Sequence, residues 1–319
     1  MMGRTALMFP GLGSYFPAAF SACPQGRRIV EEVAAQVDSA SRPYGLPSMT
    51  PALLHAPAAG GQPPGEDLMV LAVFAAEVIC HRLLAQSGSL AADVLFGHSL
   101  GEYAALVAAG GLSVTDGATL LCERGATLRR HAIPAGAMLA LSLTPRQARQ
   151  QVAAYGQTVI AAINGPEQVV LSGPAEEIDR LLRDSDGQVG PAKRLRTGAY
   201  PQHHPLLARA YQDYLQSLGS IKPKPLSCLV YSPVLGRYYL GCDDLALSLA
   251  LQMILPVDFL SAVRELHASG VRTFVECGLK RTLCDLVEAA VPSAQAIAPF
   301  RTRTTPAHIR ATLGMPGRP

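Results

Sequence analysis

The segment 97-GHSLGE-102 constrains this chain more than any other stretch. An apolar run, 93-DVLF-96, precedes it, and an alanine-rich helical run over residues 101–112 follows. This order of strand, glycine-flanked serine and helix predicts a nucleophile elbow, in which the serine hydroxyl is exposed on a sharp turn. The glycines supply unusual backbone angles and let the helix pass close to the strand. Ser99 is therefore the predicted nucleophile, and the helix N-terminus behind it favours a nearby oxyanion.

The composition is compatible with a soluble enzyme. The chain has 319 residues, of which 49% are hydrophobic and 16% charged, enough for a large core. No window reaches the roughly 18 uninterrupted apolar residues of a membrane span, and a net charge of +3 is too small to indicate nucleic acid binding. The seven cysteines form no metal-binding pattern, and the N-terminus lacks a secretion signal. We therefore expect no metal site and a cytoplasmic protein with reduced thiols.

The order of apolar segments predicts the fold class and the domain organisation. Runs of strand length alternate with helix-period segments, which indicates an α/β fold with an α/β-hydrolase-like parallel-sheet core. Between residues 135 and 198 the order becomes β-α-β-β-α-β, typical of a ferredoxin-like unit. We predict a large catalytic subdomain over 1–134 plus 199–300, a small inserted subdomain over 135–198, and a loosely ordered tail over 301–319.

A serine nucleophile needs a base within hydrogen-bond reach, normally a histidine. His98 adjoins Ser99, and a neighbour on the turn points elsewhere, so we interpret it as a supporting residue. The histidines in predicted helices or variable loops are interpreted as structural: His55, His81, His131, His267 and His308. The loop 200-YPQHHPLL-207 remains, and only one of its two adjacent histidines can be the base.

Beyond the elbow, the sequence resembles the malonyl-CoA:acyl carrier protein transacylase family, which includes the acyltransferases of fatty acid and polyketide synthases. The resemblance covers nearly the whole chain, because the motifs occur in the family's order. These motifs are 9-FPGLGS-14, 97-GHSLGE-102, 124-RG-125, 164-NGPEQVVLSG-173, 201-PQHHPLL-207, 252-QMILPV-257 and 275-VECG-278.

The resemblance implies a role for each catalytic position. Ser99 attacks a thioester carbonyl, and His203 takes its proton and later returns it to the departing thiol. The backbone N–H groups of Leu12 and Leu100 form the oxyanion hole. The family orients its histidine with a backbone carbonyl, which the resemblance places at Gln252.

Four further positions are implied to contact the substrate: Arg124, Gln202, Asn164 and Leu128. The family arginine that matches Arg124 holds the malonyl carboxylate, a task for which the planar guanidinium is suited. Three residues depart from the family pattern. Leu12 replaces a glutamine, Leu128 replaces a common methionine, and Gln202 stands where phenylalanine or serine is usual. These departures leave the chemistry intact and make the acyl group the open question.

We expect a ping-pong acyltransferase in which Ser99 takes an acyl group, by default malonyl, from CoA. It then passes the group to the phosphopantetheine thiol of an acyl carrier protein, in fatty acid synthesis or in polyketide and antibiotic biosynthesis. No bound cofactor is expected, because the CoA thioester and the phosphopantetheinylated carrier are substrates. Two alternatives keep the nucleophile: transfer of a non-malonyl acyl group between carrier proteins, and hydrolysis of stalled acyl carriers, which the presence of Arg124 disfavours. A non-catalytic docking module fits poorly with Ser99 and His203.

The expected assembly is a monomer that docks an acidic carrier protein. Basic residues suit such a partner, and the candidates by charge are Arg194, Arg196, Lys280 and Arg281.

Overall fold

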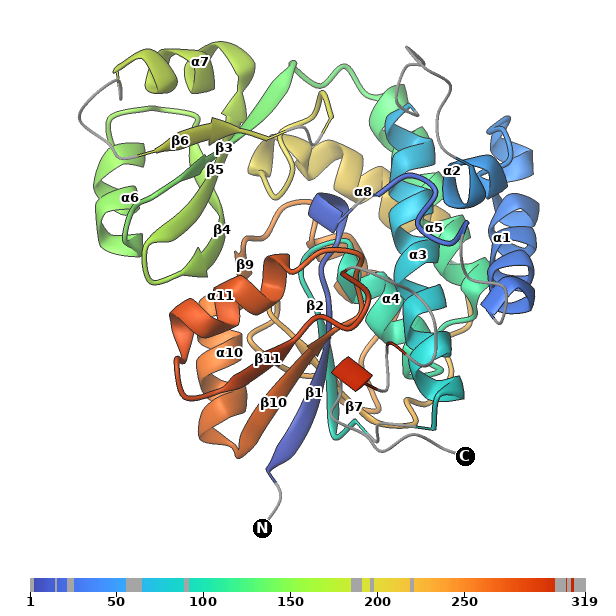
Figure 1. Ribbon diagram of the computed structural model, residues 1–319. Coiled ribbons are helices and arrows are strands. Elements are labelled where there is room, and N and C mark those ends of the chain that lie inside the picture. Colours follow the sequence, from blue (N-terminus) through green and yellow to red (C-terminus); the bar gives the residue numbers. More distant parts are fainter. Residues whose placement is uncertain are drawn as a thin grey trace.

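The computed structural model describes residues 3–14, 16–21, 26–55, 65–88, 92–184, 191–195, 198–218 and 221–301, together with His308, Ala311 and Thr312. The predicted α/β fold is confirmed: two sheets, each with its own helices, make up the described part of the chain (Figure 1). The docking candidate Arg196 and most of the predicted tail lie outside the described residues.

The larger sheet has six strands in the order β11-β10-β1-β2-β7-β8. Its neighbouring strands run parallel, except that β8 is antiparallel to β7. The strands are β1 (Arg4–Phe9), β2 (Val94–Gly97), β7 (Leu229–Ser232), β8 (Arg237–Tyr238), β10 (Val271–Glu276) and β11 (Gln295–Ile297). Parallel strands of this kind are buried on both faces and therefore read as continuous apolar runs.

The two faces of the larger sheet are covered by different helices. Leu7 and Phe9 of β1 pack into one hydrophobic cluster, whereas Ala6 and Met8 pack into another. Helices α1 (Arg27–Ser41), α3 (Glu66–Gln86), α4 (Gly101–Ala108), α5 (Val114–Arg130), α8 (Ala208–Ser217) and α9 (Leu245–Leu251) contribute to the first cluster. Helices α10 (Phe259–Ala268) and α11 (Thr282–Ala290) contribute to the second. A short helix, α2 (Thr50–Leu54), packs beside α1 and α3.

Helix α3 is long and apolar enough to cross a bilayer by length and composition alone. It has 21 residues, and 67% of its most apolar window is buried inside the protein. This burial is that of a core helix, in agreement with its packing against α1, α4 and α5.

The smaller sheet has five strands in the order β6-β3-β5-β4-β9. The first four are antiparallel neighbours, and β9 runs parallel to β4. They are β3 (Gly136–Leu141), β4 (Val159–Gly165), β5 (Gln168–Pro174), β6 (Ala192–Arg194) and β9 (Val257–Asp258). With α6 (Pro145–Val152) and α7 (Ala175–Asp184), the chain order is the predicted β-α-β-β-α-β. The fifth strand, β9, comes from outside residues 135–198.

Candidate functional site

Ser99 lies on the turn between β2 and α4, at the carboxyl end of a central strand. Its φ is 53°, in the left-handed region that a serine rarely adopts. Two glycines make this turn possible because neighbouring backbone fills the space around them. A Cβ on Gly97 would lie 2.1 Å from the Glu102 nitrogen, and one on Gly101 would lie 1.9 Å from the Phe9 carbonyl oxygen. The elbow geometry therefore depends on these two residues.

His203 faces Ser99 from a loop that is distant in the sequence. Ser99 Oγ and His203 Nε2 are 2.7 Å apart, and His203 Nδ1 is 2.9 Å from the Leu255 carbonyl oxygen. A carbonyl can only accept, so Nδ1 carries the proton and Nε2 offers its lone pair to the serine hydroxyl. His203 is buried and, like Ser99, has a positive φ, 56°. The arrangement is a serine–histidine pair oriented by a backbone carbonyl.

The carbonyl that lies within 2.9 Å of His203 Nδ1 belongs to Leu255, three residues after the position that the resemblance implies. Residues 252–255 turn back after α9, and the amide of His204 also bonds to the Met253 carbonyl at 2.9 Å. The Gln252 backbone also raises the pKa of His203, but by less than the Leu255 carbonyl does. The path of this turn therefore brings the Leu255 carbonyl, and not only the Gln252 backbone, to the His203 ring.

The environment of His203 keeps the imidazole neutral. Burial, and then the positive charge of Arg124, lower the pKa of His203 to about 3. The bond to the Leu255 carbonyl acts in the opposite direction but is weaker than burial. No carboxylate contacts this histidine among the hydrogen bonds of the described residues, so the imidazole is poised to accept a proton only when negative charge develops beside it.

The loop after β1 lies beside the nucleophile. Gly11 has φ 74°, and its N–H donates to the buried carboxylate of Glu77 at 2.6 Å. The Ser14 hydroxyl closes the loop by donating to the Gly11 carbonyl at 2.7 Å. The backbone N–H groups of Leu12 and Leu100 have no hydrogen-bond acceptor within the described part of the chain. Two unpaired N–H groups are what an oxyanion hole requires, and their convergence on a substrate oxygen stays a prediction.

Arg124, on α5, lies close enough to His203 for its positive charge to lower the pKa of that base. One of its terminal nitrogens donates to the Gln202 side-chain oxygen, and its Nε is buried without a partner among the described residues. None of the ion pairs found among the described residues involves Arg124. A guanidinium that pairs with no carboxylate in the described part of the chain retains the capacity to bind one. Leu128, on the same helix, is buried in the core.

Asn164 connects the smaller sheet to the elbow. It lies in β4, and its Oδ1 is 2.7 Å from His98 Nε2. His98 thus has a partner of its own and does not contact the Ser99 hydroxyl in the manner of a base. The structure gives Asn164 a role in holding the elbow, whereas its predicted substrate contact stays a prediction.

Sequence reasoning missed the side chains that support the site from behind. Glu102 is fully buried and accepts hydrogen bonds from the Tyr239 hydroxyl at 2.6 Å and from Gln252 Nε2 at 2.7 Å. Burial raises its pKa to about 7. The position of Glu102 inside the elbow motif is the one feature of the sequence that could have indicated its role. Its partners Tyr239 and Gln252, however, are distant in the chain. Glu77, which holds Gly11, stands in an apolar helix with no motif around it.

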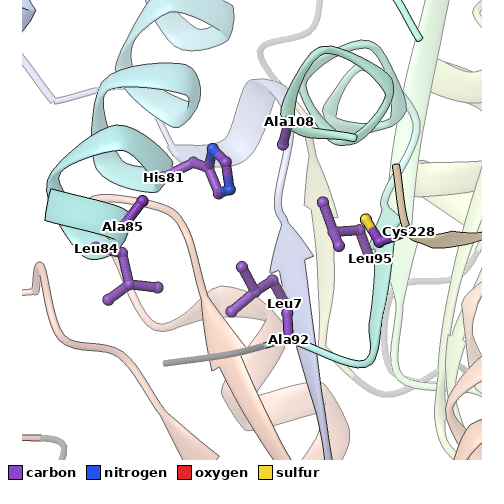
Figure 2. Close-up of a pocket in the computed structure, with 8 residues that line it drawn as sticks. All are labelled: Leu7, His81, Leu84, Ala85, Ala92, Leu95, Ala108 and Cys228. Atoms are coloured by element: carbon purple, nitrogen blue, oxygen red, sulfur yellow. The ribbon is translucent and has the colours of Figure 1, made fainter. Parts of the chain in front are cut away.

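A cavity of about 170 Å³ lies elsewhere, between α3 and α4 over the strands β1 and β2 (Figure 2). Leu7, Leu95, His81 and Cys228 are among its lining residues, and Figure 2 shows the His81 ring beside this space. None of the predicted site residues lines the cavity. It therefore gives no information about the acyl group.

The three docking candidates that lie in the described part of the chain have partners within the protein. Arg194 pairs with Asp179, Arg281 pairs with Asp285 and Glu288, and Lys280 Nζ donates to the Gly13 carbonyl at 2.9 Å. Lys280 therefore contacts the loop that carries Leu12. The docking surface stays a prediction.

Comparison with known proteins points to one family. A family model described as "Acyl transferase domain" matches residues 29–310. A spectinabilin polyketide synthase system protein from Streptomyces orinoci is 29% identical over 299 residues, which are 91% of this chain but 8% of that protein. This chain therefore spans only a small part of the length of that relative.

Solved structures agree over nearly the full length. A malonyl-CoA:acyl carrier protein transacylase from Xanthomonas oryzae pv. oryzae is 28% identical, with a TM-score of 0.84 and 98% of both chains covered. The malonyl CoA-acyl carrier protein transacylase from Coxiella burnetii is 26% identical, with a TM-score of 0.86 and the same coverage.

Proposed function

The chain belongs to the acyl transferase domain family, and from this premise we propose that it is a ping-pong S-acyltransferase acting through Ser99. The observation that carries the proposal is the 2.7 Å contact between Ser99 Oγ and His203 Nε2, with His203 Nδ1 held by the Leu255 carbonyl. This arrangement fixes the imidazole tautomer that can accept the serine proton. The first substrate is an acyl-CoA, and the acceptor is the phosphopantetheine thiol of an acyl carrier protein. Both are substrates, and no resident cofactor is needed.

In the first half-reaction, Ser99 Oγ attacks the thioester carbonyl and its proton moves to His203 Nε2. The carbonyl oxygen becomes an oxyanion, for which the N–H groups of Leu12 and Leu100 are the proposed donors. Collapse of the tetrahedral intermediate breaks the C–S bond, and His203 returns the proton to the departing CoA thiol. The second half-reaction reverses these steps with the carrier thiol, which leaves the serine free. We place this chemistry in the cytoplasm, in polyketide or fatty acid assembly.

A dicarboxylic acyl group, with malonyl as the default, is the proposed cargo. Its free carboxylate would bind Arg124, whose guanidinium pairs with no carboxylate among the described residues. That binding would also raise the basicity of His203, because the positive charge of Arg124 is a cause of its lowered pKa. A malonyl carboxylate therefore both anchors the substrate and assists the base.

One observation favours a second cargo. The Arg124 guanidinium already donates to the Gln202 amide oxygen, which occupies part of the surface that a carboxylate would use. Gln202 is buried, so this contact is shielded from water. A neutral acyl group, moved between carrier proteins, would leave the pair undisturbed.

The test is the mass added to Ser99 after incubation with malonyl-CoA, acetyl-CoA or longer acyl-CoAs, with and without a carrier protein. The expected result is a malonyl adduct that moves to the carrier and is absent in Ser99→Ala. Adducts from neutral donors alone would support the second cargo, and release of free acid without a carrier would indicate a hydrolase. Lack of any adduct would contradict the proposal.

The role of Arg124 is tested with a matched pair of variants on one helix. Arg124→Ala should reduce malonyl loading about 10- to 100-fold more than acetyl loading, because a charge-assisted hydrogen bond is lost. Arg129→Ala removes an exposed arginine of α5 that pairs with Asp67 and should change neither rate. Equal loss of both activities in Arg124→Ala would mean that this arginine is structural.

A further inference from the structure

Glu102 is linked to both Ser99 and His203, although its side chain touches neither reacting atom. The link to Ser99 is a backbone hydrogen bond, and the link to His203 runs through Gln252. The Glu102 backbone N–H donates to the Ser99 carbonyl at 3.0 Å. Its carboxylate accepts from Tyr239 Oη at 2.6 Å and from Gln252 Nε2 at 2.7 Å, and the side chain is fully buried. A buried carboxylate is costly unless its partners compensate, which makes this position a demanding place for a glutamate.

Gln252 carries the link from Glu102 to the base. It follows the last residue of α9 and begins the turn over residues 252–255. Two carbonyls of this turn hold the histidine loop: that of Met253 accepts from the His204 amide, and that of Leu255 accepts from His203 Nδ1, each at 2.9 Å. The Gln252 side chain is itself fully buried. The turn that orients the base is thus tied to the helix that follows the nucleophile.

We propose that Glu102 is a positioning residue for His203, whose ionised carboxylate fixes Gln252 and thereby the Leu255 carbonyl. The inference rests on the proposed role of His203 as the base. It extends the function of the elbow motif, because the last residue of 97-GHSLGE-102 then sets the geometry of a histidine that is distant in the sequence.

The charge of Glu102, rather than its size, performs this task. A carboxylate only accepts, so it takes hydrogen bonds from both the tyrosine hydroxyl and the glutamine amide. The other end of the amide, Gln252 Oε1, is buried without a partner among the described residues. A glutamine at position 102 keeps only one acceptor oxygen, so it cannot accept from both Tyr239 and Gln252 as the carboxylate does. The Gln252 side chain is then held less firmly, and with it the residue that begins the 252–255 turn.

The decisive experiment exchanges the two side chains. Glu102→Gln alone should lower kcat for acyl transfer about 10- to 100-fold with little change in KM, because the base is displaced while the acyl pocket is intact. The double exchange, Glu102→Gln with Gln252→Glu, restores one amide–carboxylate hydrogen bond in the reverse direction. We expect it to recover activity to within about threefold of the unmodified protein. A merely structural glutamate would show no such rescue.

A second readout does not depend on the acyl donor. A fluorophosphonate modifies an activated serine directly, so its rate of reaction with Ser99 reports the serine–histidine pair alone. The rate should fall in Glu102→Gln and recover in the double exchange. If the unmodified protein fails to react, the proposed nucleophile is wrong. If it reacts and Glu102→Gln reacts equally fast, only the positioning role is overturned.

Glu265→Gln is the matched control. Glu265, on α10, also accepts a hydrogen bond from a tyrosine hydroxyl, that of Tyr231, at 2.6 Å. No hydrogen bond found among the described residues joins Glu265 to the 252–255 turn, so its loss should leave the phosphonate rate unchanged. Far-UV circular dichroism and thermal unfolding of each variant establish that it is folded. A well-folded double exchange that stays as slow as Glu102→Gln would overturn the proposal.

Discussion

Ser99 and His203 face each other across 2.7 Å, and both have backbone φ angles in the left-handed region, 53° and 56°. Such a conformation is unfavourable for residues with a Cβ and persists only where the surroundings impose it. Close packing around Gly97 and Gly101 imposes it on the serine, and the hydrogen bonds to the 252–255 turn impose it on the histidine. The catalytic pair is therefore held by its supports against local backbone preference.

Ser99→Gly should produce a more stable protein than Ser99→Ala, by about 1 kcal/mol, because glycine adopts a positive φ without steric cost. Both variants remove the hydroxyl, so both lose all labelling by acyl-CoA. Urea unfolding at 25 °C measures the difference in the free energy of unfolding. Equal stabilities would show that the serine backbone is not strained.

Gly101→Ala should disrupt the elbow and lower the free energy of unfolding by about 3 kcal/mol or more, because its Cβ would lie 1.9 Å from the Phe9 carbonyl oxygen. Gly241→Ala is the control, since a Cβ there would meet nothing within 4 Å. Urea unfolding of the two variants gives the comparison. A Gly101→Ala protein of unchanged stability would contradict the close approach of α4 to β1.

Gln202→Ala should raise the ratio of malonyl to acetyl loading about tenfold, because the guanidinium of Arg124 loses its internal acceptor and becomes free for a carboxylate. Gln202→Glu should lower the same ratio, since a carboxylate of the protein itself would then occupy Arg124. Initial loading rates with the two CoA thioesters give both values. If neither variant changes the ratio, the contact between Gln202 and Arg124 does not influence selection.

The pH dependence of serine phosphonylation should depend on Glu102 and not on His203. Burial raises the pKa of Glu102 to about 7, so its carboxylate is protonated, and the proposed positioning is lost, as the pH falls through 7. His203, with a pKa lowered to about 3 by burial and then by Arg124, stays neutral over this range. Burial also raises the pKa of Tyr239 and of Tyr103, which flank Glu102 and remain neutral.

The rate in the unmodified protein should therefore fall between pH 8 and pH 5, whereas the slower Glu102→Gln variant should show a flat profile. Rates at half-unit steps of pH define both curves. A decline in the variant near pH 6.5 would assign the titration to a histidine instead.

Glu102→Gln should also gain stability relative to the unmodified protein as the pH rises. The pKa of Glu102 is about 7 in the folded protein against an ordinary value of 4.5, so the folded state holds the proton more tightly. Its contribution to stability is present at low pH and is lost as the pH rises from 4.5 through 7. The variant does not undergo this loss. The free energy of unfolding of Glu102→Gln minus that of the unmodified protein should therefore be about 1 to 3 kcal/mol larger at pH 8 than at pH 5, measured by urea unfolding. A constant difference between the two pH values would mean that Glu102 does not titrate there.

The sequence predicted the features that are local. The elbow could be recognised because strand, glycines, serine and helix are contiguous, and the β-α-β-β-α-β order of the smaller sheet could be recognised for the same reason. The loop over residues 200–207 left two candidate histidines, and the resemblance to the family identified His203 as the base. The Leu255 carbonyl could not be predicted, because the path of a four-residue turn after α9 decides which oxygen meets the imidazole. The pairing of Glu102 with Gln252 joins positions 150 residues apart, and neither residue has a local pattern that indicates the other.

The pairing of β9 with β4 limits how this protein can be recombined with its relatives. Val257 and Asp258 of β9 pair with Ala162 and Ile163 of β4. The β4 residues come immediately before Asn164, and the β9 residues follow shortly after Leu255. A chimaera that transplants only residues 135–198 would carry four strands and expose the edge of β4 to a foreign partner. The same cut would remove the β9 pairing beside Asn164, the residue that bonds to His98. Exchange of acyl preference by grafting should therefore move the segment from Gln252 to Asp258 together with the smaller sheet.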